Sequence, residues 1–143
     1  MKKRKYKMQQ RARDLEETRQ RIVTAAMDLH GTVGPKNTTI SAVADKAGVQ
    51  RLTVYRHFPD DVALFQACSA HWLELNPPPG IATPDGAESA NDYTRQVLGA
   101  LYSYYRQTRS MWRLVYRDLD EVDARFEEMA ALYKKYLELN DKH

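Results

Sequence analysis

The amino-acid sequence predicts an all-α fold. Apolar residues recur every three or four positions through most of the chain, which is the period of a helix, and no segment alternates convincingly with the two-residue period of a strand. Glycine and proline then divide this pattern into separate helices, as at Gly31, Gly34 and Pro35. Hydrophobic residues make up 43% of the 143 residues, which is enough to build a core.

Charge and composition narrow the class of protein. Residues 1–66 contain 13 Lys and Arg against 7 Asp and Glu, whereas residues 67–143 contain 9 against 12, and a basic front half suits contact with nucleic acid. There is no apolar run of membrane length, no secretory signal and a single cysteine, Cys68, so we expect a cytoplasmic protein with no membrane contact and no disulfide framework. Because phosphate-binding loops and nucleophile motifs are missing too, we expect no enzyme and no cofactor.

The front half is predicted to start with a basic flexible arm at residues 1–14. The first thirteen residues carry seven Lys and Arg and no acid, which suits either contact with DNA or a solvated tail. A DNA-binding domain is expected at residues 15–66, and its first helix runs from Asp14 until Gly31. In this helix Leu15, Ile22, Ala26 and Leu29 recur at helical spacing.

Three shorter helices are predicted to follow the first one. Thr38 or Thr39 offers a hydroxyl cap to a helix at residues 40–47, and Gly48 ends it. A third helix covers residues 51–58, up to Pro59. Asp60 then caps a fourth helix at residues 61–75.

The rear part, residues 67–143, is predicted to be a helical effector-binding and dimerisation domain. Four prolines and two glycines in residues 76–86 indicate an irregular connection. A long helix is expected from about Tyr93 to Tyr104, then a short segment at residues 111–116, and a last helix from Asp118 or Asp120.

Residues 38–64 fit the physical requirements of a helix-turn-helix. Two crossing helices need a small residue at their contact, which Ala44 supplies, and a turn residue that tolerates positive φ, which Gly48 supplies four positions later. If Val54 points into the core, Leu52 and Arg56 face the opposite side and Thr53 and Tyr55 lie on the flanks. The residues expected to face inward are Val43, Val49, Val54 and Phe58.

The exposed side of the third helix carries groups that read DNA. Gln50 and Arg51 stand at its N-terminus, the end that enters the major groove in this motif, where Arg51 suits guanine and Gln50 suits adenine. Tyr55, Arg56 and His57 suit phosphate or thymine-methyl contacts. Two packed helices without DNA-binding function would share the Ala and Gly spacing, but the polar and cationic run QRLTVYRH favours DNA binding.

At these residues the chain resembles the tetracycline-repressor (TetR) family of bacterial regulators. The segment TTISAVADKAGVQRLTVYRHFPDDVALF carries the resemblance, which is close from about Thr18 to Ala70 and only general beyond Pro77. It implies backbone contacts at the start of the second helix, base contacts at the start of the third, and phosphate contacts further along the third. Together with the residue chemistry, the predicted DNA-binding residues are Thr39, Ser41, Gln50, Arg51, Leu52, Thr53, Tyr55, Arg56 and His57.

Two positions depart from the family pattern. The family commonly has Gly, Ala or Pro where this chain has Leu52, a larger apolar side chain that favours thymine methyls and crowds the groove. At Asp61 the family usually shows a phosphate-gripping lysine, and a carboxylate there removes that attraction while suiting the helix N-terminus.

The resemblance also implies a ligand pocket and a dimer in the rear part. An effector that is hydrophobic or aromatic would be lined by aromatic residues, although ordinary packing is the commoner role for any one of them. The predicted pocket residues are Trp72, Tyr93, Tyr102, Tyr104, Tyr105, Trp112 and Tyr116. No metal site is expected, because Cys68 and His71 supply only two possible ligands.

The family fold has nine or more helices, and about seven are found here, so we interpret the chain as a short or truncated member. We expect a homodimer on pseudo-palindromic double-stranded DNA, through the apolar residues of the last helix: Phe126, Met129, Tyr133, Tyr136 and Leu137. The predicted function is a transcriptional repressor released by a small molecule. The alternative is a truncated helical interaction module that pairs with a related regulator.

Overall fold

The computed structural model describes residues 2–80 and 87–118, together with Asp120, Val122 and Glu127. Within them the chain forms five α-helices, one 3₁₀ helix and no strand, which confirms the predicted all-α fold. The elements are α1 (Lys2–Thr32), η1 (Pro35–Asn37), α2 (Ile40–Ala47), α3 (Arg51–His57), α4 (Asp61–Leu75) and α5 (Ala90–Arg117).

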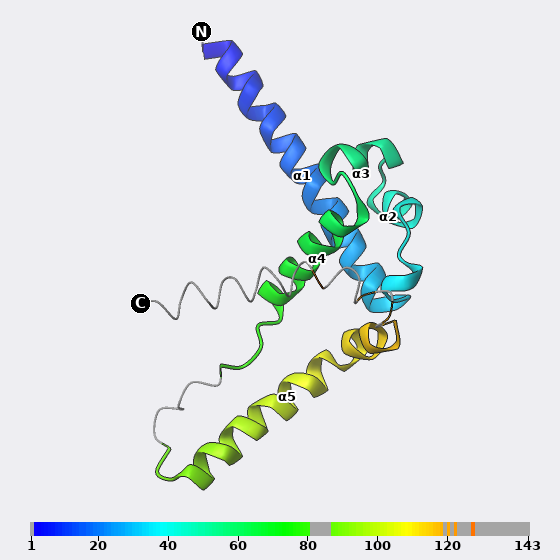
Figure 1. Ribbon diagram of the computed structural model, residues 1–143. Coiled ribbons are helices and arrows are strands. Elements are labelled where there is room, and N and C mark those ends of the chain that lie inside the picture. The colour runs from blue at the N-terminus through cyan, green and yellow to red at the C-terminus, as the bar shows by residue number, and fades with distance from the viewer. Residues whose placement is uncertain (1, 81–86, 119, 121, 123–126, 128–143) are drawn as a thin grey trace.

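The core lies where α1 crosses α2, α3 and α4 (Figure 1). The predicted inward positions Val43, Val54 and Phe58 are at most 3% exposed, which confirms the face assigned to each helix, and Val49 packs against the same core while half-buried. Burial of these side chains is the main favourable term that holds the short helices α2 and α3 in place, because helices of this length are unstable alone. The buried cluster comprises Ile22, Val23, Ala25, Ala26, Val43, Ala44, Val54, Phe58, Leu64 and Cys68.

The turns of this bundle have the predicted chemistry. The hydroxyl of Thr39 accepts a hydrogen bond from the Ala42 N–H (3.1 Å), so Thr39 rather than Thr38 caps α2. Gly48 adopts the left-handed conformation (φ 68°) that ends α2. The carboxylate of Asp60 accepts from the Ala63 N–H (2.8 Å) and caps α4.

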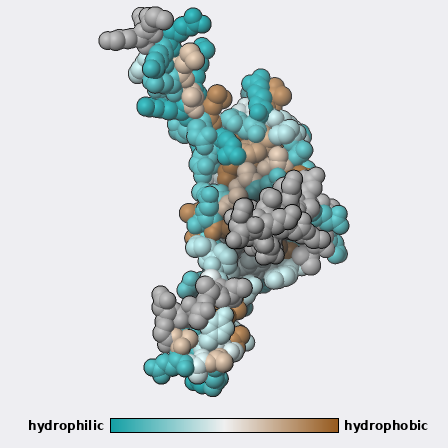
Figure 2. Space-filling model, turned by 60° about the vertical axis from the view of Figure 1, so that its left-hand side comes forward, coloured by the Kyte–Doolittle hydropathy of each residue, from teal (hydrophilic) through white to brown (hydrophobic). Residues whose placement is uncertain are grey.

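The predicted flexible arm at residues 1–14 is instead the front part of α1. Lysine, arginine, glutamine, methionine and alanine dominate residues 2–13, and all of them favour helix, while neither glycine nor proline interrupts the stretch. This part of α1 projects beyond the packed helices (Figure 1), and mostly hydrophilic residues cover it (Figure 2). Leu15 is 59% exposed, so the packed part of α1 begins after it.

The rear of the described chain is one long helix, α5. The separate segment predicted at residues 111–116 belongs to it, because no helix-breaking residue stands between Ala100 and Arg117. The last turns of α5 pack on the end of α1, while its front turns project away at the opposite end of the molecule from the N-terminus (Figure 1). The dimer interface predicted in the last helix lies outside the described residues; it comprises Phe126, Met129, Tyr133, Tyr136 and Leu137.

Among the helices that the structure describes, none combines the length and the apolar character that crossing a membrane requires.

Candidate nucleic-acid interface

Helix α3 presents a polar and cationic side to solvent. Its buried side is fixed by Val54 in the middle and by Phe58 just after its end. Because a helix turns by about 100° per residue, Leu52 and Arg56 then face outward, and Leu52 is 60% exposed. The prediction that these two residues lie opposite Val54 is therefore confirmed.

The N-terminal end of α3 offers two polar side chains to a ligand. Gln50 is the residue before the first turn, and its side chain makes no capping hydrogen bond to this helix. Arg51 opens the helix and is exposed. An amide and a guanidinium at the tip of a helix are the groups that pair with base edges in the major groove. This end of α3 is thus chemically able to read bases.

The flanks of α3 and the start of α2 supply groups suited to phosphate. Tyr55 is 41% exposed, and Thr53 and His57 are half-buried beside it. The oxygen of Thr39 is occupied by capping, but its O–H remains a donor in an exposed position, and the exposed Ser41 follows in the first turn. Hydroxyl, phenol and imidazole donors at these places suit backbone contacts, which fix the register of a protein on DNA.

A residue of α1 that the sequence analysis did not single out supports this surface. The guanidinium of Arg19 lies over the ring of Phe58, 5.0 Å from its centre. Such a cation–π contact contributes about 0.5–1 kcal/mol at an exposed site. It ties α1 to the residue that closes α3, and no local periodicity could have revealed a pair 39 positions apart.

The projecting part of α1 is strongly basic. Five exposed cations follow one another there: Arg4, Lys5, Lys7, Arg11 and Arg13. Asp61 is exposed in the first turn of α4, where a carboxylate stabilises the helix N-terminus. The basic residues predicted to form a flexible arm therefore lie on a helix.

The predicted effector residues do not form one pocket. Trp72 and Trp112 line a shared apolar cavity with their rings edge to face, 5.8 Å apart. Tyr102, Tyr105 and Tyr116 are 76%, 48% and 60% exposed on α5, and the first two border an open hollow instead. Tyr93 is half-buried near the start of α5, and Tyr104 donates a hydrogen bond to the Asn76 carbonyl (3.2 Å).

The two possible metal ligands, Cys68 and His71, have separate surroundings. The sulfur of Cys68 lies 3.2 Å from Nδ1 of His30, and His71 lies near Gln20 and Glu74 instead. In residues 2–80 and 87–118 no group of three or more His, Cys, Asp or Glu is arranged to hold a metal ion.

Comparison with known proteins identifies the family to which this DNA-binding sequence pattern belongs. Residues 22–68, which span most of α1's packed part through to Cys68 of α4, match the family model described as bacterial regulatory proteins, tetR family. The uncharacterized HTH-type transcriptional regulator TtgW of Pseudomonas putida is 34% identical over 113 residues, covering 77% of this chain and 81% of that protein. The chain belongs to the TetR family.

A second relative of this TetR-family chain is the HTH-type transcriptional regulator SrpR of Pseudomonas putida. It is 35% identical over 113 residues, which cover 77% of this chain and 51% of that protein. The chain thus matches about half the length of SrpR. No solved structure matches the chain significantly.

The structure adds a junction between head and rear that no sequence pattern indicated. The Asp118 carboxylate, after the end of α5, accepts from the backbone N–H of Lys36 in η1 (3.1 Å) and from Nε of Arg117 (2.7 Å). Arg117 also donates to the Val33 carbonyl at the end of α1 (2.8 Å). Gly34 has φ 91°, and a side chain there would collide with Arg117 and Asp118. We call Arg117 and Asp118, with their bonds to Val33 and Lys36, the latch.

Proposed function

We propose that this TetR-family chain is a repressor that binds an operator as a homodimer and releases it when a small molecule binds. The proposal rests mainly on α3: its apolar side is fixed in the core by Val54 and Phe58, while Gln50, Arg51 and Leu52 stand exposed at its N-terminal end. A helix held in this way presents its tip to the major groove.

Arg51 is the residue on which sequence preference should depend most. A guanidinium paired bidentately with guanine contributes about 1–3 kcal/mol of discrimination. We therefore expect Arg51→Ala to weaken binding to the preferred site by roughly that amount and to relax the preference at one position in each half-site. The site is first obtained by selection from random duplexes, and binding is then followed by fluorescence anisotropy.

Arg109→Ala is the matched control, because Arg109 is an exposed arginine on α5, away from α3. It should leave preference unchanged. An equal loss of affinity for Arg51→Ala on every duplex, with no change in preference, would show that Arg51 contacts only phosphate.

The alternative function is a helical module that pairs with a related regulator and does not bind an operator alone. Asp61 favours it, because an exposed carboxylate at the start of α4 repels phosphate where the resemblance leads one to expect a lysine. Asp61→Lys separates the two functions. A large gain of affinity from a wild type without measurable binding supports the pairing module, whereas wild-type binding in the specific range supports the repressor.

A further inference from the structure

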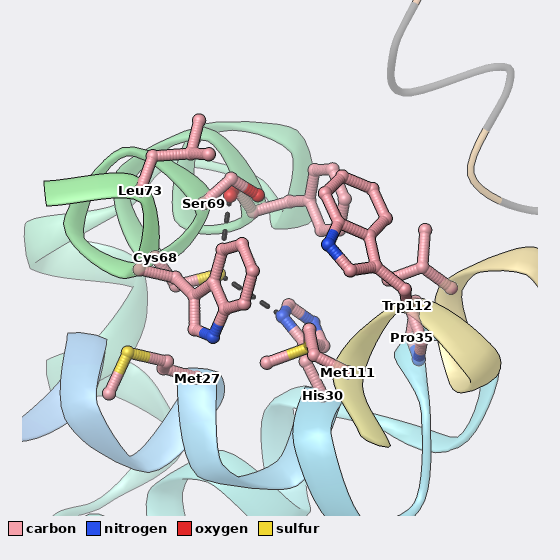
Figure 3. Close-up of a pocket in the computed structure, with 11 residues that line it drawn as sticks. Met27, His30, Pro35, Cys68, Ser69, Leu73, Met111 and Trp112 are labelled. Carbon is pink, nitrogen blue, oxygen red and sulfur yellow. Dashed lines mark hydrogen bonds between the residues drawn. The ribbon is translucent and has the colours of Figure 1, made fainter. Parts of the chain in front are cut away.

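A small apolar pocket lies where the DNA-reading head meets the rear helix. Its walls come from α1, η1, α4 and the last turns of α5 (Figure 3). The cavity has a volume of about 90 Å³, which is smaller than the roughly 300–1,000 Å³ of sites for drug-sized molecules. It therefore suits a ligand with a single small ring. The lining residues are Met27, His30, Pro35, Phe65, Cys68, Ser69, Trp72, Leu73, Met111, Trp112 and Val115.

The chemistry of the walls selects an uncharged ligand. Among the described residues, no lysine, arginine, aspartate or glutamate lines the pocket, so a charged group entering it would lose its hydration without gaining a charged partner there. Two of the few polar groups face each other, since Cys68 Sγ lies 3.2 Å from His30 Nδ1 (Figure 3). Cys68 also donates to the Phe65 carbonyl (3.2 Å).

Aromatic side chains give the pocket a preference for flat ligands. Trp72 and Trp112 meet edge to face at 5.8 Å, and His30 meets Phe65 in the same way at 5.2 Å. Rings attract one another in edge-to-face and offset-stacked arrangements, and this attraction adds to the effect of burial. A ligand ring placed among these four rings would gain further contacts of this kind.

One buried group makes the closed pocket easier to open. The indole N–H of Trp112 makes no hydrogen bond in the described part of the chain. Burial raises the pKa of the neighbouring Tyr104, whose hydroxyl donates to the Asn76 carbonyl (3.2 Å), and the Trp112 indole opposes this rise. A buried donor without a partner destabilises the closed arrangement, and movement of α5 that admits water would relieve this cost.

The pocket touches the parts that connect α5 to the head. Pro35 of its wall directly precedes Lys36, whose N–H bonds Asp118, and Val115 precedes Arg117 by two residues. Met111 lies against Gly31 of α1, where an added Cβ would come within 3.3 Å of its terminal carbon. A ligand that separates α5 from α1 and α4 therefore pulls on the latch, and η1 leads directly into α2.

We propose that this junction pocket binds a small, neutral, aromatic molecule, and that its occupation moves α5 against η1 and lowers the affinity of α3 for DNA. The second half rests on the proposed repressor function; the first half does not.

Binding is tested without DNA, using two probes of almost equal shape. p-Xylene is neutral, and p-toluate carries a carboxylate in place of one methyl group. Trp72 and Trp112 are the only two tryptophans and both line the pocket, so their fluorescence reports occupancy. We expect a saturable change with p-xylene and at least about tenfold weaker binding of p-toluate, since an unpaired buried charge costs well over 1.4 kcal/mol. No saturable change with p-xylene, or equal binding of both probes, overturns the proposal.

A filled pocket provides the second test. Ser69→Phe adds a ring at the wall, and Ser103→Phe makes the same change at an exposed position of α5. Ser69→Phe should abolish p-xylene binding and Ser103→Phe should preserve it, with circular dichroism showing that both stay helical. Unchanged binding in a folded Ser69→Phe variant places the ligand elsewhere and overturns the proposal. If Ser69→Phe does not fold, the comparison of the two probes on the wild type decides alone.

The effect on DNA is measured separately with the selected duplex. Saturating p-xylene should lower DNA affinity at least about fivefold in the wild type and leave it unchanged in Ser69→Phe. Saturable p-xylene binding with unaltered DNA affinity overturns the coupling. If the wild type binds no duplex at all, the proposed repressor function fails, while the fluorescence result still decides whether the pocket is a ligand site.

Discussion

Asp118 binds the end of α5 to η1 through a hydrogen bond from Lys36. Its side chain is almost fully buried, and hydrogen bonds from Arg117 hold the pKa of the carboxyl below its ordinary value of 3.8; burial opposes this shift, and the Lys36 N–H adds to it. Because the folded pKa lies below the unfolded one, the stabilisation is complete above about pH 4 and is lost as pH falls through the folded value. Asp118→Asn should therefore lower the free energy of unfolding by about 1–3 kcal/mol at neutral pH, and this difference should shrink below pH 4.

Urea unfolding over a pH series measures this, and Asp120→Asn, at an exposed carboxylate two residues on, is the control. A difference that stays constant down to the lowest pH would mean that the Asp118 charge is not involved.

The sequence predicted that Gly34 helps to end the first helix, but not that Asp118 occupies the space beside it. Contacts between residues more than 80 positions apart leave no local pattern in one sequence.

The bounds and buried faces of the short helices were predicted most accurately from the sequence. The bounds predicted for α2 and α4 agree with the structure, because Thr39, Gly48 and Asp60 are strong local signals. The start of α1 differs from the prediction, because the charge of residues 1–14 indicates a flexible arm whereas the high helix propensity of the same residues extends the helix to Lys2. The aromatic residues predicted to line one pocket divide between two hollows: Trp72 and Trp112 line the apolar cavity, whereas Tyr102 and Tyr105 border the open one. The rings of Tyr105 and Tyr116 still contact the ring of Trp112.

The cations on the front part of α1 are predicted to contact DNA phosphates. A helix holds its cations at fixed positions, and each phosphate that they neutralise adds about 0.9 to the slope of log affinity against log salt. Replacing Arg4, Lys5, Lys7, Arg11 and Arg13 by glutamine keeps a good helix former at every position. We expect weaker binding to all duplexes, a shallower salt dependence and unchanged base preference. Arg95→Gln and Arg106→Gln, at exposed positions of α5, are controls; an unaltered slope in the five-fold variant would mean that α1 does not reach the DNA.

At the scale of the whole molecule, two helices project from one small head (Figure 1). A single helix-turn-helix head covers one half-site, and alone it should bind on the order of 10⁻⁴ to 10⁻⁶ M, in the range of non-specific binding. Selective repression needs far tighter binding than that. Two heads placed about 34 Å apart, or a multiple of it, on pseudo-palindromic DNA supply the difference. If the chain acts as the proposed repressor, it therefore has to self-associate.

Two surfaces are candidates for the interface of the proposed dimer. The sequence favours the last helix, with Phe126, Met129, Tyr133, Tyr136 and Leu137, whereas the described part of the chain exposes Leu98, Tyr102 and Tyr105 on α5. We predict a dimer through the last helix. Tyr133→Glu should therefore dissociate the dimer, because a buried unpaired carboxylate opposes association. Tyr102→Glu should leave the dimer intact, because Tyr102 lies on α5 outside this predicted interface. Sedimentation over a concentration series, with and without the selected duplex, measures both. Dissociation by Tyr102→Glu alone would move the interface to α5, and a wild-type monomer that still binds a palindromic site tightly would refute the requirement for a dimer.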